Sequence, residues 1–402
     1  MLILGIDHLI SNKKLLAKLK GARVALLANQ ASVNAKTEHS LDILANCQDI
    51  KLVAAFGPQH GMTTDKQDNM IESDDYFHPT YKIPVFSLYG KVRRPTKEMM
   101  DSFDILLVDI QDLGVRFFTY ITSVLYLLEA CADYGKAIWI LDRPNPIGRP
   151  IDGTILESDM ESFIGATAMP TRYGLTIAEL ASFFVKTKAL DVDLQIVPMV
   201  GYQMNKLPGY GWPLNELSWV NPSPNASSLN MARVYAGTAL FEGTTLSEGR
   251  GTSNPLEQIG APDIDFNRIL QLMKELAPRW LLGCTLRLCH FEPTFDKYMG
   301  KLCSGIQIHA DNASYNHNSF KPYRLAALML KAIRLAYPEY PVWRDFYFEY
   351  EKDRLAIDLL SGSSFLRKWV DDSSKSIHDF EEKLNKGEKT WKALITPFII
   401  YG

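Results

Sequence analysis

Residues 103–146, FDILLVDIQDLGVRFFTYITSVLYLLEACADYGKAIWILDRPNP, contain a complete strand–helix–strand unit. Two nearly continuous apolar runs, at 103–110 and 138–142, are typical of parallel strands that are buried on both faces. Between them, apolar residues recur at helical spacing over 118–134, and Gly135 follows, where glycine tolerates the left-handed geometry of a helix cap. The stretch therefore predicts a β–α–β unit of a parallel sheet.

The chain on either side of this unit shows the same alternation. Further buried strands are predicted at 21–30, 52–61, 83–90 and 194–199, and helices at 40–46 and 176–190. The polar segment 62–82 is predicted to be a long loop, and long loops in compact domains are commonly functional. This pattern predicts a doubly wound α/β domain, in which ligands bind outside the carboxyl ends of the strands.

A second alternation follows in the C-terminal part of the chain. Residues 201–231 and 241–255 are rich in turn-forming residues, and we expect the first segment to cross between domains. Beyond them, helices are predicted near 266–282, 323–337 and 376–386, and strands near 285–291 and 305–309. We therefore expect two domains, 1–225 and a smaller α/β domain at 226–402, with the functional site in the cleft between them.

Composition excludes several classes of protein. The formal net charge of −3, without a long basic run, argues against nucleic acid as a partner. The five scattered cysteines form no CxxC pair, which favours reduced thiols in a cytoplasmic protein. We find no signal peptide and no apolar run of about 18 residues, so we expect no membrane association.

The motifs of cofactor-dependent and serine enzymes are missing. The first predicted strand ends in ANQASV rather than in a GxGxxG turn, and no P-loop, GxSxG or HExxH pattern occurs in the sequence. His290 and His309 lie inside predicted strands, where we interpret them as structural. The sequence thus predicts no cofactor and no metal.

Carboxylates are the remaining source of reactivity, and glycoside hydrolysis needs only two of them. The candidates at strand ends and in irregular segments are Glu72, Asp109, Asp112, Asp142, Asp152, Glu242 and Glu248. Structural alternatives are a polar network for Asp109 and Asp112 and an ion pair with Arg250 for Glu242 and Glu248. A further candidate, the mid-helix Glu129, is more typical of a solvated helix residue. Arg116 and Tyr120, at the start of the helix, are candidates to bind a carboxylate or sugar hydroxyls. These features alone predict a two-domain α/β enzyme of unknown substrate.

A series of longer motifs narrows this prediction. In chain order they are LGIDHLI (4–10), VALLANQASV (24–33), FGPQHG (56–61), IPVFSLYG (83–90), VDIQDLGVRFFTYI (108–121), LDRPNPIG (141–148), TRYGLTIAELA (171–181), NPSPN (221–225) and FEGTTLSEGRGTSNPLEQIGAP (241–262). Together they resemble the exo-β-N-acetylmuramidases of the NamZ type. The resemblance implies a Rossmann-like N-terminal domain, a smaller C-terminal α/β domain and an active site in the cleft between them. It also implies hydrolysis of terminal, non-reducing N-acetylmuramic acid (MurNAc) from peptidoglycan fragments without a cofactor. The lack of an export signal favours a role in cell-wall recycling of imported fragments.

The resemblance also exposes a departure. The catalytic glutamate of the family lies in a PEHG motif and matches Gln59 here, whose amide cannot act as an acid or base but can orient a water or a sugar amide. Three interpretations follow: Glu72 substitutes for it; the catalytic pair is drawn from Asp109, Asp112, Glu129, Glu242 and Glu248; or the chain binds muropeptides without hydrolysing them, as a sensor. A hydrolase of another acidic amino sugar is a further alternative. The RHG motif of the family is also changed, to Arg172-Tyr173-Gly174.

Substrate-binding roles follow from the same resemblance. Arg116 or Arg250 is expected to bind the lactyl carboxylate, and Asp112, Tyr120 and Asn145 the hydroxyls or the acetamido group. His60, Arg143, Glu242 and Glu248 complete the set of candidate binding residues.

Overall fold

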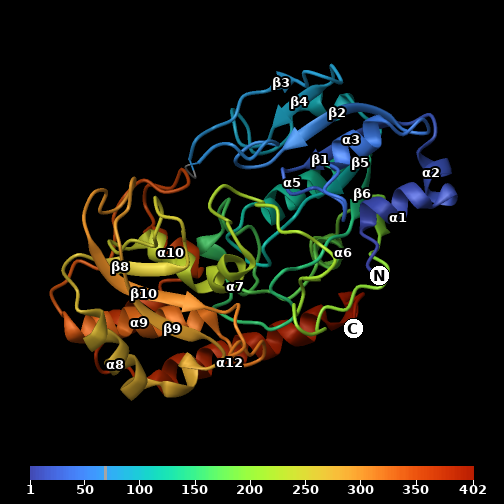
Figure 1. Ribbon diagram of the computed structural model, residues 1–402. Helices are drawn as coiled ribbons and strands as arrows, with labels where there is room; N and C mark the ends of the chain where they lie inside the picture. The colour runs from blue at the N-terminus through green and yellow to red at the C-terminus, as the bar shows by residue number, and fades with distance from the viewer. Residues whose placement is uncertain (68–69) are drawn as a thin grey trace.

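The computed structural model describes residues 1–67 and 70–402 (Figure 1). Its larger unit is built on a seven-stranded sheet. The strand order is β3 (Tyr76–Phe77), β4 (Pro84–Ser87), β2 (Lys51–Gly57), β1 (Arg23–Ala28), β5 (Ile105–Asp109), β6 (Ala137–Leu141) and β7 (Leu194–Val197). All neighbours pair in parallel except β3, which pairs antiparallel with β4. From β1 the chain builds outward to β2 and β4, then returns to β5 and builds the other way. The switch point therefore lies between β1 and β5, whose carboxyl ends adjoin each other.

Helices cover both faces of this sheet, as expected for a doubly wound domain. Helices α1 (Gly5–Ser11), α2 (Lys13–Leu19) and α3 (Ser40–Ala45) share one apolar cluster with Leu26 and Leu107. Helices α5 (Tyr120–Asp133) and α6 (Ile177–Thr187) pack with Leu27 and Val108 on the other face. Adjacent strand residues thus point to opposite apolar layers, which explains why these strands read as continuous apolar runs.

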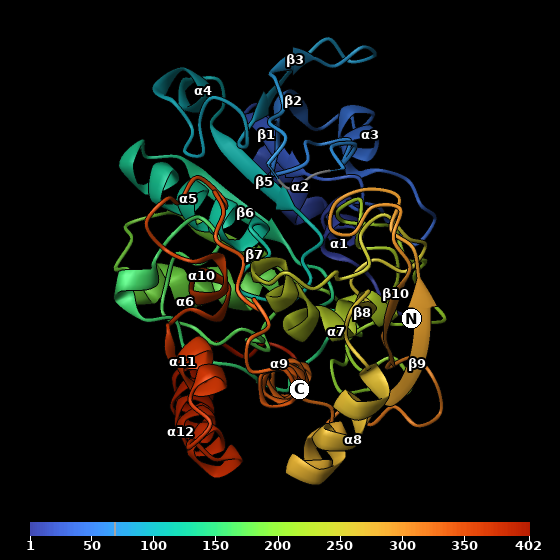
Figure 2. The ribbon, with the colours of Figure 1, turned by 90° about the vertical axis from the view of Figure 1, so that its left-hand side faces the viewer.

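The second unit is built on a three-stranded antiparallel sheet of order β8 (Gln258–Ala261), β10 (Cys303–His309) and β9 (Thr285–Phe291). It carries α7 (Leu229–Thr238), α8 (Phe266–Leu276), α9 (Pro322–Ala336), α10 (Ala356–Ser361), α11 (Phe365–Asp371) and α12 (Ile377–Ile395). The predicted mixed α/β fold with a smaller second sheet is confirmed. Figure 2 shows the two sheets with α7 and α9 lying below the larger one.

Element boundaries differ from the predictions where local signals are weak. The helix expected over 266–282 ends at Leu276 and is followed by the 3₁₀ turn η3 (Pro278–Leu281), because proline cannot continue the backbone hydrogen bonds. The helix expected over 376–386 continues to Ile395 as α12. The segment 62–82, which includes the undescribed residues 68–69, contains the short edge strand β3 and is not wholly a loop.

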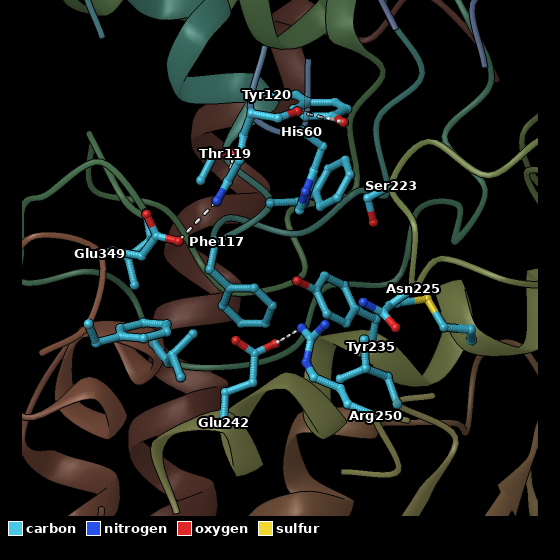
Figure 3. Close-up of a pocket in the computed structure, with 17 residues that line it drawn as sticks. His60, Phe117, Thr119, Tyr120, Ser223, Asn225, Tyr235, Glu242, Arg250 and Glu349 are labelled. Carbon is cyan, nitrogen blue, oxygen red and sulfur yellow. Dashed lines mark hydrogen bonds and ion pairs between the residues drawn. The ribbon is translucent and has the colours of Figure 1, made fainter. Parts of the chain in front are cut away.

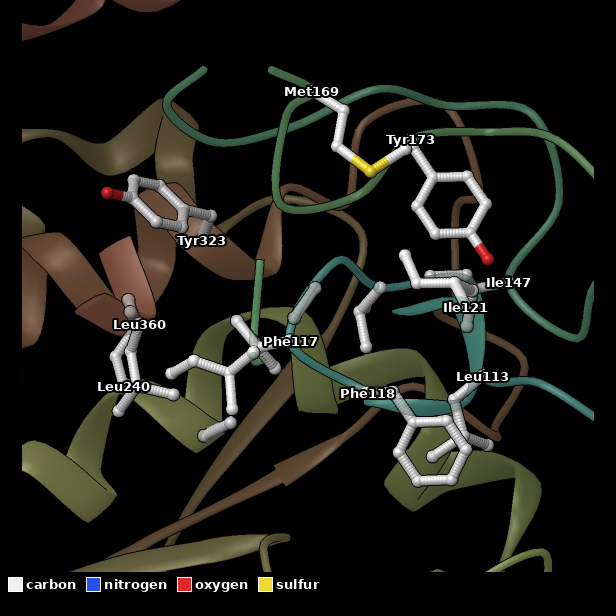
Figure 4. Close-up of a cluster of buried hydrophobic side chains, with 14 of the residues drawn as sticks. Leu113, Phe117, Phe118, Ile121, Ile147, Met169, Tyr173, Leu240, Tyr323 and Leu360 are labelled. Carbon is white, nitrogen blue, oxygen red and sulfur yellow. The ribbon is translucent and has the colours of Figure 1, made fainter. Parts of the chain in front are cut away.

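One apolar core runs through both units. Figure 4 shows Phe117, which follows β5, on the side of Leu240 and Leu360 of the second unit, and Phe118 beside Leu113. Helix α12 then returns to the large sheet: Trp391 packs edge-on against Phe183 of α6, and its indole Nε1 donates to the Tyr173 carbonyl over 2.8 Å. The two units are therefore fixed against each other. Within the described residues, no helix is long and apolar enough to cross a membrane.

Candidate active site

A pocket lies between the carboxyl ends of the large sheet and the second unit (Figure 3). The loop after β2 and the start of α5 line one side, and α7, the 3₁₀ turn η2 (Ala239–Gly243) and two irregular segments line the other. Its polar lining residues are Gln59, His60, Thr119, Tyr120, Ser223, Asn225, Tyr235, Glu242, Arg250 and Glu349. Both units thus contribute to one polar cavity, in the cleft where the sequence predicted a site.

Gln59 is held in one orientation by two hydrogen bonds. Its Oε1 accepts from the Thr119 hydroxyl over 2.6 Å, and its Nε2 donates to Glu349 Oε1 over 3.0 Å. Because an amide has distinct donor and acceptor ends, the bond from Thr119 turns the NH₂ group toward Glu349. The second Glu349 oxygen accepts from the Tyr89 hydroxyl over 2.7 Å.

Glu349 is a buried carboxylate on a strained segment. Glu349 is 6% exposed, and burial raises the pKa of its carboxyl to about 7. The hydrogen bonds from Tyr89 and Gln59 oppose this shift. Glu349 has φ 47° and Tyr350 has φ 69°, so two successive residues other than glycine adopt left-handed backbone. Such a backbone costs about 1–3 kcal/mol at each residue and clusters at functional sites.

A second carboxylate enters the pocket from η2. Glu242 Oε1 lies 2.8 Å from an Arg250 nitrogen, and the same guanidinium lies 3.2 Å from Glu248, which also pairs with Lys297 over 2.6 Å. Burial raises the pKa of Glu242 against the attraction of Arg250. Burial also acts on Glu248, but Lys297 and Arg250 outweigh it and lower its pKa. Glu242 is thus the easier of the two glutamates to protonate.

The opposite wall carries neutral and aromatic groups. In Figure 3, His60, Ser223 and Asn225 lie across the pocket from Glu349. His60 adopts φ 70°, and its Nδ1 lies 2.7 Å from the Lys66 carbonyl. Tyr120 donates to the Pro222 carbonyl over 2.6 Å, which ties the start of α5 to the crossing segment.

A larger outer pocket opens beside the first one. It shares Glu242, Arg250 and Phe348 with the inner pocket, and Glu248 lines only the outer one. The remaining outer residues are largely apolar or aromatic and include Met70, Ile71, Phe295 and Phe346, together with Gln67, Asp296 and Arg344. The inner polar pocket thus continues outward into a wider space with aromatic walls.

Five of the sequence-predicted residues meet in the inner pocket: Gln59, His60, Tyr120, Glu242 and Arg250. Asp109 and Arg143 do not line it. They form a buried ion pair of 2.9 Å, and Arg143 also donates to the carbonyls of Ala31 and Val33. The alternative of a structural polar network thus describes Asp109 better than a catalytic role.

Asp112, Arg116 and Asn145 also lie outside the inner pocket. Asp112 accepts from the Tyr173 hydroxyl, and burial raises its pKa to about 6. Asn145 caps a turn by accepting from the Ile147 amide over 3.0 Å. The Arg116 side chain is fully buried and donates to the Leu360 carbonyl over 2.9 Å, so it braces the contact between the units.

Glu72, the predicted substitute for Gln59, and Glu129, a candidate for the catalytic pair, both form ion pairs away from the inner pocket. The Glu72 side chain is 50% exposed and bonds the Tyr350 hydroxyl over 2.9 Å. Glu129 pairs with Arg94 over 2.6 Å on α5. Neither lines the inner pocket. Asp142 and Asp152 are buried structural acceptors: Asp142 bonds the Ala178 amide at the start of α6, and Asp152 bonds the Tyr323 amide at the start of α9.

Sequence reasoning missed Glu349, Thr119, Ser223, Asn225 and Tyr235. Glu349 lies 290 residues from Gln59, in a segment without helical or strand periodicity. Its one local signal is the acidic and aromatic run FEYE at 348–351. Ser223 and Asn225 belong to the quoted NPSPN motif, which could have drawn attention to them. Among the described residues, no group of three or more His, Cys, Asp or Glu side chains is arranged to hold a metal.

Comparison with known proteins assigns the chain to a family. The model of the exo-β-N-acetylmuramidase NamZ N-terminal region matches residues 24–230, and that of the C-terminal region matches residues 233–401. The chain belongs to the NamZ family. A curated NamZ relative, the peptidoglycan β-N-acetylmuramidase NamZ of Bacillus subtilis strain 168, is 38% identical over 392 residues, which cover 96% of this chain and 89% of the relative.

Two solved structures of DUF1343 family proteins from Bacteroides fragilis NCTC 9343 share the NamZ-family fold. One has a TM-score of 0.85 at 28% identity, and the other has a TM-score of 0.72 at 26% identity. Each comparison covers 100% of this chain and 99% of the other chain.

Proposed function

We propose that this NamZ-family protein is an exo-acting β-N-acetylmuramidase that releases terminal, non-reducing MurNAc from peptidoglycan fragments. The observation that carries the proposal is a single pocket, lined by both units, that holds two buried carboxylates and one guanidinium, those of Glu242, Glu349 and Arg250. Two carboxyl groups are what glycoside hydrolysis requires. The relationship to a peptidoglycan β-N-acetylmuramidase supports the choice of substrate.

Arg250 is the proposed partner of the lactyl carboxylate that distinguishes MurNAc from other amino sugars. Its planar guanidinium offers a bidentate fork to a carboxylate, and it lines both the inner and the outer pocket. Glu242 and Glu248 lie 2.8 Å and 3.2 Å from the Arg250 guanidinium and hold it where the two pockets meet.

The outer pocket is proposed to hold the leaving part of the substrate. Its aromatic side chains, Phe295 and Phe346, provide apolar surface beside the polar inner pocket. A closed inner pocket for one sugar and a wider space for the remainder of the fragment fit removal of one terminal unit at a time.

The experiment compares two disaccharides that differ in the lactyl group, MurNAc-GlcNAc and GlcNAc-GlcNAc. We expect hydrolysis of the first and at least 10-fold slower hydrolysis of the second, and Arg250→Met should erase most of this preference, since about 1.4 kcal/mol of binding corresponds to a factor of ten. Asn225→Ala, which removes an uncharged polar side chain from the same pocket, serves as the matched pocket variant and should keep the preference. Saturable MurNAc-GlcNAc binding without any product would instead identify a sensor of muropeptides.

A further inference from the structure

Glu349 is a buried carboxylate that faces the pocket beside Gln59, whose amide cannot act as an acid or base. We propose that Glu349 is the proton donor for glycosidic bond cleavage in this protein, with Gln59 as the residue that positions it. The assignment rests on the proposed hydrolase function and names the residue that performs its first step.

Contacts fix Glu349 in place and leave it able to react. Gln59 and Tyr89 each donate one hydrogen bond to a different oxygen of the carboxylate. A carboxylate has about four acceptor positions, so these bonds leave lone pairs directed elsewhere. Figure 3 shows the side chain entering the pocket from the wall opposite Asn225 and above Glu242. Glu349 and Tyr350 both adopt left-handed backbone, a strained conformation that clusters at functional sites.

The surroundings favour the protonated acid near neutral pH. The charged and titratable groups around Glu349 are Tyr89 and Arg93 from the segment after β4, Glu242 from η2, Tyr235 from α7 and its neighbour Tyr350. Burial is the largest influence and Glu242 adds like charge, so the pKa of Glu349 rises to about 7. A general acid performs best when its pKa lies near the working pH.

The step balances with one water molecule. The Glu349 carboxyl gives its proton to the bridging oxygen while the bond from that oxygen to the anomeric carbon breaks, and the electron pair stays on the oxygen. Water adds to the anomeric carbon, and its surplus proton passes to a second carboxylate, for which Glu242 is the candidate that lines the same pocket. Solvent exchange then restores the proton on Glu349, so the net change is the hydrolysis of one glycosidic bond.

Gln59 is a positioning residue in this scheme. Thr119 fixes its amide, the amide fixes the Glu349 carboxyl, and the donated bond stabilises the carboxylate that forms after proton transfer. Without the amide donor, burial would raise the pKa of Glu349 further and make proton release harder.

The experiment measures wild type and Glu349→Gln on two substrates that differ in leaving group. MurNAc-GlcNAc releases a sugar alcohol that needs a proton, whereas 4-nitrophenyl β-MurNAc releases a phenolate that does not. We expect kcat/KM of Glu349→Gln to fall about 10²–10⁴-fold on the disaccharide, because this is the usual contribution of general acid catalysis to the rate. The fall on the nitrophenyl glycoside should be far smaller. On the disaccharide, wild-type activity should fall above about pH 7, because Glu349 loses its proton there, and this fall should be missing from the residual activity of Glu349→Gln on the same substrate.

Two controls keep the outcome interpretable. Glu351→Gln, two residues away and paired with Arg354 on the surface, should retain full activity, and calorimetric binding of MurNAc by Glu349→Gln shows that the pocket is folded. Glu349→Asp keeps a carboxyl group and should recover part of the activity. Equal losses on both substrates, or no loss at all, would overturn the assignment while leaving the hydrolase function standing. A wild-type protein that hydrolyses neither substrate would remove both.

Discussion

At position 59 an amide donates a hydrogen bond to a buried carboxylate, and this pair gives a direct prediction for Gln59→Glu. The substitution removes the donor and places two carboxyl groups about 3 Å apart, where both cannot ionise together. We expect the apparent pKa that limits activity at high pH to rise above that of wild type, as measured by the pH profile of kcat/KM. Glu72→Gln, at the surface, is the control, and an unchanged profile in Gln59→Glu would contradict the coupling of the two side chains.

For individual residues, prediction of the site from the sequence succeeded at some positions and failed at others. Gln59, His60 and Tyr120 follow strands or begin a helix at the carboxyl edge of the sheet, so their convergence follows from the topology alone. Asp109 and Asp142 satisfy the same rule but serve as buried acceptors. The sequence does not reveal this role, because their partners, Arg143 and the Ala178 amide, lie far away in the sequence. Glu349 could not be found in this way, since only the packing of the second unit brings it to Gln59.

Among the elements, α12 is predicted to have the largest effect on stability. Its Trp391 is buried, packs on Phe183 and hydrogen-bonds the Tyr173 carbonyl, so it joins the C-terminal helix to the larger sheet unit. Trp391→Ala should lower the free energy of unfolding by about 3–5 kcal/mol, because it leaves a cavity and an unpaired carbonyl. Urea denaturation provides the measurement.

Leu394→Ala is the matched variant on the same helix, since Leu394 is 53% exposed. Its expected change is within about 0.5 kcal/mol. If both variants shifted the urea midpoint equally, α12 would not be anchored through Trp391.

Element prediction from sequence worked where burial imposes a pattern and failed where packing overrides it. The strands β1, β5 and β6 lie between two apolar layers, so each shows a continuous apolar run. Short helices such as α10 and α11 lack enough residues to display a period. Tertiary contacts determine them instead, those of α10 with η2 and those of α11 with α9. Pro278 marks the end of α8, because proline cannot continue the backbone hydrogen bonds, so the helix predicted over 266–282 is too long.

For the whole molecule, buried acids predict an unusual dependence of stability on pH. Burial raises the pKa of Asp112 to about 6 and that of Asp142 and Glu349 to about 7. A raised carboxyl pKa means that the folded state binds the proton more tightly than the unfolded state. The contribution of these groups to stability is therefore complete below their ordinary values of 3.8 and 4.5 and is lost as the pH rises toward 7.

We expect the urea midpoint to fall between pH 5 and pH 7.5, and Asp142→Asn to reduce that fall. The variant should also be less stable than wild type at pH 5. Thr176 and Ala178 donate to different oxygens of Asp142, and in asparagine one of these oxygens is replaced by an NH₂ nitrogen, which cannot accept a hydrogen bond. Asp265→Asn, at the exposed start of α8, is the control and should leave the pH slope unchanged. The same slope in Asp142→Asn as in wild type would show that Asp142 does not titrate in this range.

The most direct measurement of the central claim, that a NamZ-family site with glutamine at position 59 remains a glycosidase, is a count of MurNAc molecules released per protein molecule from MurNAc-GlcNAc. Mass spectrometry of the products over a time course at pH 6–7 provides that count. Many molecules of free MurNAc and GlcNAc per protein molecule, formed in equal amounts, are the predicted result. Release no faster than in buffer, from protein that still binds the disaccharide, would contradict it.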